Sequence, residues 1–182
     1  MPKSQPDKFA ELMLYIAKVC EDDPNFGATK LNKILFFSDF SAYRKWQKSI
    51  TSATYQKLAH GPAPQCLVPV RDRLISDGSL EIREVDRYTR MQKRPVARRE
   101  PNLDAFTANE IALVDAIIDA MKDANATAVS EASHGFWWQV AEIGEDIPIG
   151  VSLVEFPEEV SPEEQLHAQS LEQRACRLIT AA

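Results

Sequence analysis

The sequence contains little glycine, histidine or cysteine, and each shortage argues against a class of site. Its six glycines are scattered over 182 residues, and none forms the G-x-G-x-x-G or Walker pattern that cradles a phosphate. The three histidines share no short spacing with one another or with a cysteine, so the chain lacks the usual signature of a zinc site. We therefore expect neither a metal ion nor another cofactor.

The sequence also lacks a residue pattern that would support covalent catalysis. It has no G-x-S-x-G nucleophile elbow, and no acid and base stand at a spacing that would pair them. His60 precedes Gly61, and a histidine in that position is more typical of a turn residue that caps backbone groups than of a general base. We therefore predict that the protein is not an enzyme and has no catalytic residues.

Cysteine usage and the absence of long apolar runs indicate the compartment. The three cysteines, Cys20, Cys66 and Cys176, are far apart and lie in apolar surroundings, as is typical of reduced thiols in a cytosolic protein. No run approaches the roughly 18–20 apolar residues that a membrane span needs. The stretch MPKSQPDKFAEL lacks the apolar core of a secretion signal. We expect a cytoplasmic protein that does not associate with membranes.

The net charge of −6 is unevenly distributed along the chain. Residues 1–122 contain 19 basic and 16 acidic side chains, which gives +3, whereas residues 123–173 contain 11 acidic side chains and no lysine or arginine. Such a chain is expected to present an acidic face that repels nucleic acid and attracts a basic partner at low salt. The alternative is a solvated surface that only keeps the protein soluble.

Hydrophobic periodicity predicts one mainly helical α+β domain over residues 1–182. A small β-hairpin is expected after the third helix, because Leu80 and Ile82 alternate with polar residues and Val96 lies in a second weak strand. Thr107 begins a helix, since Thr107 and Glu110 fit a capping box. The other helices are predicted over residues 6–21, 28–46, 64–76, 127–133 and 161–180.

The predicted helix over residues 28–46 is the expected centre of the fold. Its run Ile34-Leu35-Phe36-Phe37 covers more than half of the helical circumference, which is typical of a buried helix. Lys30, Lys33 and Asp39 are then expected on the remaining exposed strip. Trp46 lies near the end of this helix, where an aromatic side chain can reach a partner.

Residues 50–64, ITSATYQKLAHGPAP, are the clearest candidate for a binding surface. Thr51 and Tyr55 favour extended or capping conformations, although a short helix over residues 52–59 is an alternative. The run Gly61-Pro62-Ala63-Pro64 predicts a rigid turn, with Pro64 in the first turn of the next helix. The candidate partner-contacting residues are Trp46, Tyr55, His60, Gly61, Pro62, Pro64, Trp137 and Trp138.

A basic segment over residues 83–99 supports an alternative function. It contains seven basic side chains opposed by Glu84 and Asp86, which gives +5. A basic hairpin after a helix resembles the wing of a winged-helix DNA-binding regulator. The whole chain is acidic, however, so nucleic acid is not the favoured partner, and the arginines could instead pair with the acidic C-terminal half. The candidate basic contact residues are Arg87, Arg90, Arg94, Arg98 and Arg99.

Two blocks of the sequence resemble motifs of a known family. Residues 30–40, KLNKILFFSDF, resemble a K-L-x-K-L-L-Y-F-A-D/x-F helix. Residues 50–64 resemble an I-T-x-x-x-Y-x-x-x-x-x-G-P-V-P block, with Ala63 where the family often has valine. Taken together, the blocks make the chain similar to the SocA-like Panacea antitoxin family, with a motif-bearing core over about residues 6–80.

This resemblance implies an antitoxin of a bacterial toxin–antitoxin pair. Family members neutralise a cognate toxin protein by direct contact. One type of member is a proteolytic adaptor that delivers its toxin to the ClpXP protease, so the resemblance also implies the ClpX unfoldase as a second partner. The C-terminal half carries no motif that transfers, and the resemblance therefore assigns neither the toxin contacts nor the protease contacts.

Overall fold

The computed structural model describes residues 7–87, 90–122, 124, 127, 130, 133 and 141–153. Four α-helices and two small antiparallel sheets form this part of the chain, which confirms the α+β prediction. The helices are α1 (Lys8–Val19), α2 (Ala28–Trp46), α3 (Leu67–Ser76) and α4 (Ala108–Met121). Two short 3₁₀ turns, η1 (Leu103–Ala105) and η2 (Ile149–Leu153), accompany them.

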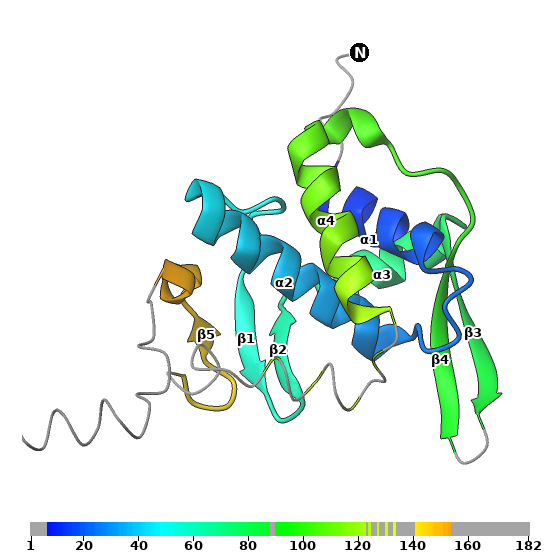
Figure 1. The fold of residues 1–182 in the computed structure, drawn as a ribbon. Coiled ribbons are helices and arrows are strands. Elements are labelled where there is room, and N and C mark those ends of the chain that lie inside the picture. Colours follow the sequence, from blue (N-terminus) through cyan, green and yellow to red (C-terminus); the bar gives the residue numbers. More distant parts are fainter. Residues whose placement is uncertain are drawn as a thin grey trace, which may run out of the picture.

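The two sheets lie on different sides of α2 (Figure 1). One contains β1 (Tyr55–Leu58), β2 (Gly61–Pro64) and β5 (Asp146–Ile147) in the order β2-β1-β5. The other is the hairpin of β3 (Leu80–Arg87) and β4 (Arg90–Ala97), which follows α3 as the sequence predicts. The predicted helix over residues 161–180 lies outside the described residues, as does most of the one over 127–133.

Helix α2 is buried on two sides, which explains its apolar circumference. Ile34 and Leu35 belong to one core cluster, formed with residues of α1, α3 and α4. Phe36 and Phe40 belong to a second cluster, where they pack with Tyr55 of β1. The centre of the helix therefore faces other helices on one side and the three-stranded sheet on the other, as a helix that is apolar on most sides requires.

The predicted turn at Gly61–Pro64 is wrong, because these residues form strand β2, and the third helix begins at Leu67 instead of Pro64. Proline is tolerated here since β2 is an edge strand. The amide of Gln65 donates to the carbonyl of Thr54, and hydrogen-bonding positions alternate along a strand. The backbone nitrogens of Pro62 and Pro64 therefore point away from β1, where no N–H donor is needed.

The turn itself lies earlier, at Ala59 and His60. It ends in Gly61, whose φ of 96° falls in the region that favours glycine. The alternative helix over residues 52–59 is also excluded, since Tyr55–Leu58 form β1. Local signals alone placed the change of chain direction correctly within this segment but assigned it to the wrong residues.

The prediction that Lys30, Lys33 and Asp39 lie on an exposed strip of α2 is wrong. Their exposed fractions are 1%, 1% and 0%. The prediction failed because each charge finds partners inside the protein, which makes burial tolerable. Lys30 Nζ lies 2.7 Å from Asp23 Oδ2 and donates to the carbonyl oxygens of Lys122 and Ala124, so it joins the start of α2 to the end of α4.

Candidate partner-binding surface

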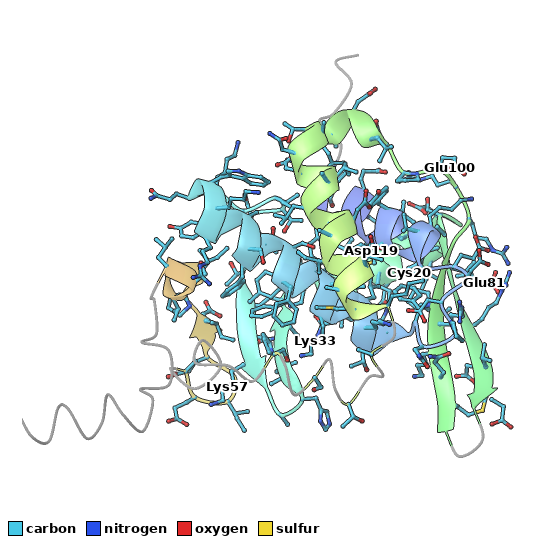
Figure 2. The ribbon with its side chains drawn as sticks, in the orientation of Figure 1. Cys20, Lys33, Lys57, Glu81, Glu100 and Asp119 are labelled. Atoms are coloured by element: carbon cyan, nitrogen blue, oxygen red, sulfur yellow. The ribbon has the colours of Figure 1, made fainter. Side chains whose placement is uncertain are left out.

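A buried lysine fastens the β1–β2 hairpin to α2. Lys33 Nζ donates to the carbonyl oxygens of His60 at 2.9 Å and Pro62 at 3.1 Å. Asn32 Nδ2 donates to the same Pro62 oxygen. Burial lowers the pKa of Lys33 to about 8, because removing an ammonium from water disfavours its charged form. Figure 2 shows Lys33 between α2 and the hairpin that it holds.

A buried carboxylate fastens the segment that precedes this hairpin. Asp39 accepts hydrogen bonds from the amide and hydroxyl of Thr51 and, at 2.8 Å, from the hydroxyl of Tyr55. Burial raises the pKa of Asp39, although the hydrogen bonds from Thr51 and Tyr55 oppose this shift. Burial and the neighbouring Asp39 raise the pKa of Tyr55 as well, so its phenol stays protonated and can donate.

These contacts place several candidate partner-contacting residues inside the molecule. Tyr55 is 1% exposed, and Gly61, Pro62 and Pro64 are buried. They therefore position the hairpin and do not offer their side chains to a partner. Contacts of Tyr55 and Pro62 with α2 contribute to this burial, and periodicity alone does not reveal them. Trp137 and Trp138 lie outside the described residues.

Two apolar side chains and a histidine are exposed at the turn end of the hairpin. We call Leu58, His60 and Ile143 the tip patch; Leu58 is 38% and Ile143 68% exposed, and His60 is exposed too. Ile143 reaches this end of the sheet because the amide of Gly144 donates to the carbonyl of Lys57. Sequence reasoning missed Ile143, since a single apolar residue among polar neighbours carries no periodic signal.

A second exposed surface surrounds Trp46, another candidate residue. A shallow groove lies between the end of α2 and the start of α4, and we call it the Trp46 groove. The partly buried indole packs against the main core cluster, and Lys45 Nζ lies 5.6 Å from its ring centroid. The lining residues are Lys45, Trp46, Lys48, Thr107, Asn109, Glu110, Ala112, Leu113 and Ala116.

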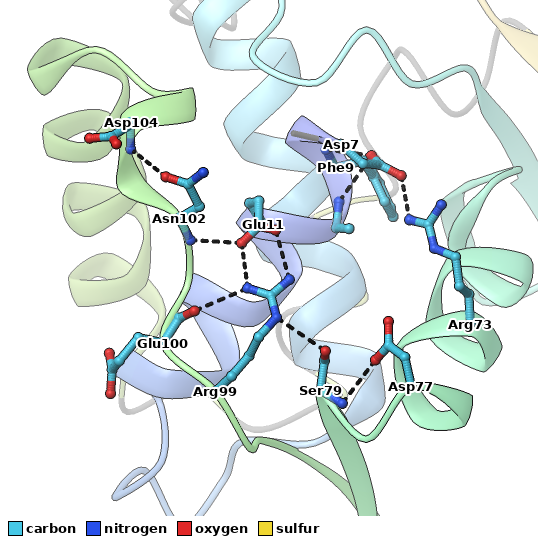
Figure 3. A network of polar contacts seen from close by, with 11 residues as sticks. Asp7, Phe9, Glu11, Arg73, Asp77, Ser79, Arg99, Glu100, Asn102 and Asp104 are labelled. Atoms are coloured by element: carbon cyan, nitrogen blue, oxygen red, sulfur yellow. Dashed lines mark hydrogen bonds and ion pairs between the residues drawn. The ribbon is translucent and has the colours of Figure 1, made fainter. Parts of the chain in front are cut away.

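Several basic side chains of the hairpin segment form contacts within the protein. Arg99 forms a two-pronged ion pair with Glu11 of α1, at 2.7 and 2.8 Å (Figure 3). Arg98 pairs with Glu81 of β3, and Arg94 donates to the backbone carbonyl of Glu21. The described partners thus lie in the N-terminal half, and most of the acidic C-terminal half, with which the arginines were expected to pair, lies outside the described residues. The side chains of Arg87 and Arg90 lie outside the described residues.

These ion pairs weaken the winged-helix interpretation, because arginines engaged with carboxylates are poor phosphate ligands. The Glu11 carboxylate also accepts a hydrogen bond from the amide of Asn102 at 2.7 Å. The hydrogen bonds from Arg99 are the largest influence on the pKa of Glu11, and they lower it. The end of β4 therefore serves to join the hairpin to α1, and this role leaves less positive charge for DNA.

Replacing Arg99 with methionine should lower the free energy of unfolding by about 2–3 kcal/mol, because it leaves the Glu11 carboxylate enclosed without its cation. Urea denaturation followed by circular dichroism measures this loss. The matched control is Arg83→Met, since Arg83 pairs with Glu81 at an exposed site and should contribute only about 0.5 kcal/mol. Equal losses in the two variants would contradict the structural role of Arg99.

The described residues contain no arrangement suited to metal or thiol chemistry. No group of three or more His, Cys, Asp or Glu side chains among them could hold a metal ion. Burial raises the pKa of the Cys20 thiol to about 12, so this cysteine stays protonated and unreactive. In the same part of the chain, every helix is too short or too polar to cross a membrane.

Comparison with known proteins identifies one family. The model of the family described as "Antitoxin SocA-like, Panacea domain" matches residues 31–139. The matched range covers more than half of the chain and includes the β1–β2 hairpin and both walls of the Trp46 groove. Neither the curated proteins nor the solved structures contain a match to this chain.

Proposed function

Because the chain belongs to the SocA-like antitoxin family with a Panacea domain, we propose that it binds its cognate toxin protein directly and neutralises it. The family match is the observation on which this proposal rests, and membership supports a generic antitoxin role. The buried contacts of Lys33 and Asp39 are consistent with direct binding. They hold the hairpin in one position, and a preorganised surface loses less conformational entropy when it binds.

We further propose that the protein neutralises the toxin by delivering it to the ClpXP protease. An adaptor of this kind has to hold its cargo and the ClpX unfoldase at the same time, so it needs two separate surfaces. The tip patch and the Trp46 groove are two such surfaces. Figure 1 shows that the turn between β1 and β2 lies at the end of the hairpin that is remote from the last turn of α2. Trp46 is the final residue of that helix.

A degradation assay with purified components tests the proposal. The product of the adjacent reading frame, used as the candidate toxin, is incubated with ClpXP and ATP, with and without this protein. We expect toxin degradation to be about 10-fold faster or more when the protein is present, because tethering raises the effective concentration of cargo at the protease. Size-exclusion chromatography of the two proteins without protease measures their complex separately.

Each result has a distinct meaning. A stable complex whose toxin is degraded no faster would leave the antitoxin role intact but refute delivery, since the protein would then only mask the toxin. Absence of a complex at micromolar concentrations would refute direct neutralisation. A parallel reaction with proteolytically inactive ClpP controls for loss of toxin by precipitation.

A further inference from the structure

The Trp46 groove carries an unbalanced positive charge. Lys45 and Lys48 both line it, and neither forms an ion pair with another described residue. Glu110 is the lining carboxylate, but its oxygens are occupied: Lys8 Nζ lies 2.6 Å from Oε1, and the Thr107 amide donates to Oε2 at 2.8 Å. The lysines are therefore available for carboxylates from outside the protein.

The α4 side of the groove carries an open apolar strip beside the polar side chain of Asn109. Ala112 and Ala116 are exposed and lie one turn apart on α4, so they share a face of that helix. Leu113 completes the lining on the α4 side, opposite Trp46. The small alanines leave the indole accessible beside them, and a partly buried tryptophan next to apolar surface is a frequent energetic centre of protein interfaces.

We propose that the Trp46 groove docks an acidic segment of the toxin polypeptide. An apolar side chain of that segment packs on Trp46 and the alanines, while carboxylates on either side of it meet Lys45 and Lys48. The identification of the occupant as the toxin rests on the proposed function. The charge of the groove supports an acidic segment, because two lysines without an ion pair to a described residue, next to an apolar strip, complement an apolar residue flanked by acids.

Nucleic acid fits this groove less well than an acidic polypeptide. Unpaired lysines and an aromatic ring could in principle contact a phosphate and a base. Two lysines are the cations that the described residues place in its lining, and the whole chain carries a net charge of −6. A nucleic acid would therefore meet long-range repulsion with few compensating phosphate contacts. A short acidic segment needs no more cations than the groove supplies.

Two variants at one position test the proposal. Ala112→Glu and Ala112→Lys add side chains of similar length to an exposed helical site, so neither should disturb the core. Both side chains fill the same space in the groove and differ mainly in charge, so if the occupant is acidic, the Kd of Ala112→Glu for the purified toxin should exceed that of Ala112→Lys about 10-fold or more. Biolayer interferometry measures both values, and circular dichroism confirms that both variants are folded.

Charge reversal of the lysines supplies a second measurement. The double variant Lys45→Glu/Lys48→Glu should raise the Kd about 10-fold or more and should flatten its dependence on salt. The matched control is Lys93→Glu/Arg83→Glu, which makes the same charge change on the exposed β3–β4 hairpin. This control should bind the toxin as the wild type does.

The outcomes separate the inference from the proposed function. If the wild type binds toxin and both Ala112 variants bind equally, whether tightly or weakly, the acidic occupant is refuted while the antitoxin role stands. If the wild type binds no toxin, the proposed function fails and the named occupant fails with it. If duplex DNA binds in place of toxin, and Lys45→Glu/Lys48→Glu abolishes that binding, the groove is a nucleic-acid site and the proposal is overturned.

Discussion

Replacing Asp39 with alanine should lower the free energy of unfolding by about 3–5 kcal/mol. The carboxylate is fully buried, and the Thr51 amide, the Thr51 hydroxyl and the Tyr55 hydroxyl all donate to it. Alanine removes the shared acceptor, so the amide and hydroxyl of Thr51 lose their partner, and the Tyr55 hydroxyl keeps only the carbonyl of Leu35 at 2.9 Å. Urea unfolding followed by circular dichroism, with the slope checked for two-state behaviour, measures the loss.

Two further variants separate the carboxylate from its surroundings. Tyr55→Phe keeps the ring that packs on Phe36 and Phe40 and removes only one hydroxyl, so it should cost about 1 kcal/mol. Asp39→Asn keeps one acceptor oxygen and should fall between the other two variants. If Asp39→Ala is no more destabilising than Tyr55→Phe, the carboxylate does not organise the segment between α2 and β1.

The stability of the protein should depend on pH through Lys33. Burial lowers the pKa of this lysine from 10.5 to about 8 in the folded state, so between these values the unfolded chain binds more protons than the folded one. The contribution of Lys33 to stability therefore increases as the pH rises from about 8 towards 10.5. A neutral amine still donates to both carbonyls, those of His60 and Pro62.

The measurement is the difference in unfolding free energy between wild type and Lys33→Met across this pH range. Other groups titrate there too, and the subtraction removes their effects. We expect the difference to shift by about 2–3 kcal/mol in favour of the wild type at high pH. The matched control is Asn32→Ala, which removes the neighbouring donor to Pro62 without a titratable group and should shift stability equally at every pH. A constant difference for Lys33→Met would contradict a depressed pKa.

Elements with strong local signals could be predicted from the sequence. The structure confirms α2 at residues 28–46, the hairpin after the third helix, and the capping box in which Thr107 and Glu110 exchange hydrogen bonds at the start of α4. Each depends on residues within a few positions of one another. Apolar spacing and capping chemistry act over that range, so these predictions required no knowledge of distant contacts.

Predictions that depended on distant contacts failed. The run Gly61–Pro64 has the composition of a turn, yet it pairs with β1 as an edge strand that tolerates proline. Lys33 and Asp39 look like surface residues of an amphipathic helix, yet their partners are 29 and 12 positions away in the chain. The candidate binding surface differs from the predicted one for the same reason. Contacts with α2 bury Tyr55 and Pro62, whereas the hairpin turn stays exposed and Trp46 is only partly buried.

The sequence by itself determined that this is an α+β protein with a central apolar helix, and its motifs were sufficient to recognise the antitoxin family. Those properties follow from residue order, because helical spacing and family motifs are read along the chain. Only the tertiary structure decided which charges are buried and which side chains a partner can reach. Burial and accessibility depend on groups that folding brings together, and the pairing of Lys33 with the backbone of the hairpin exists only in the folded chain.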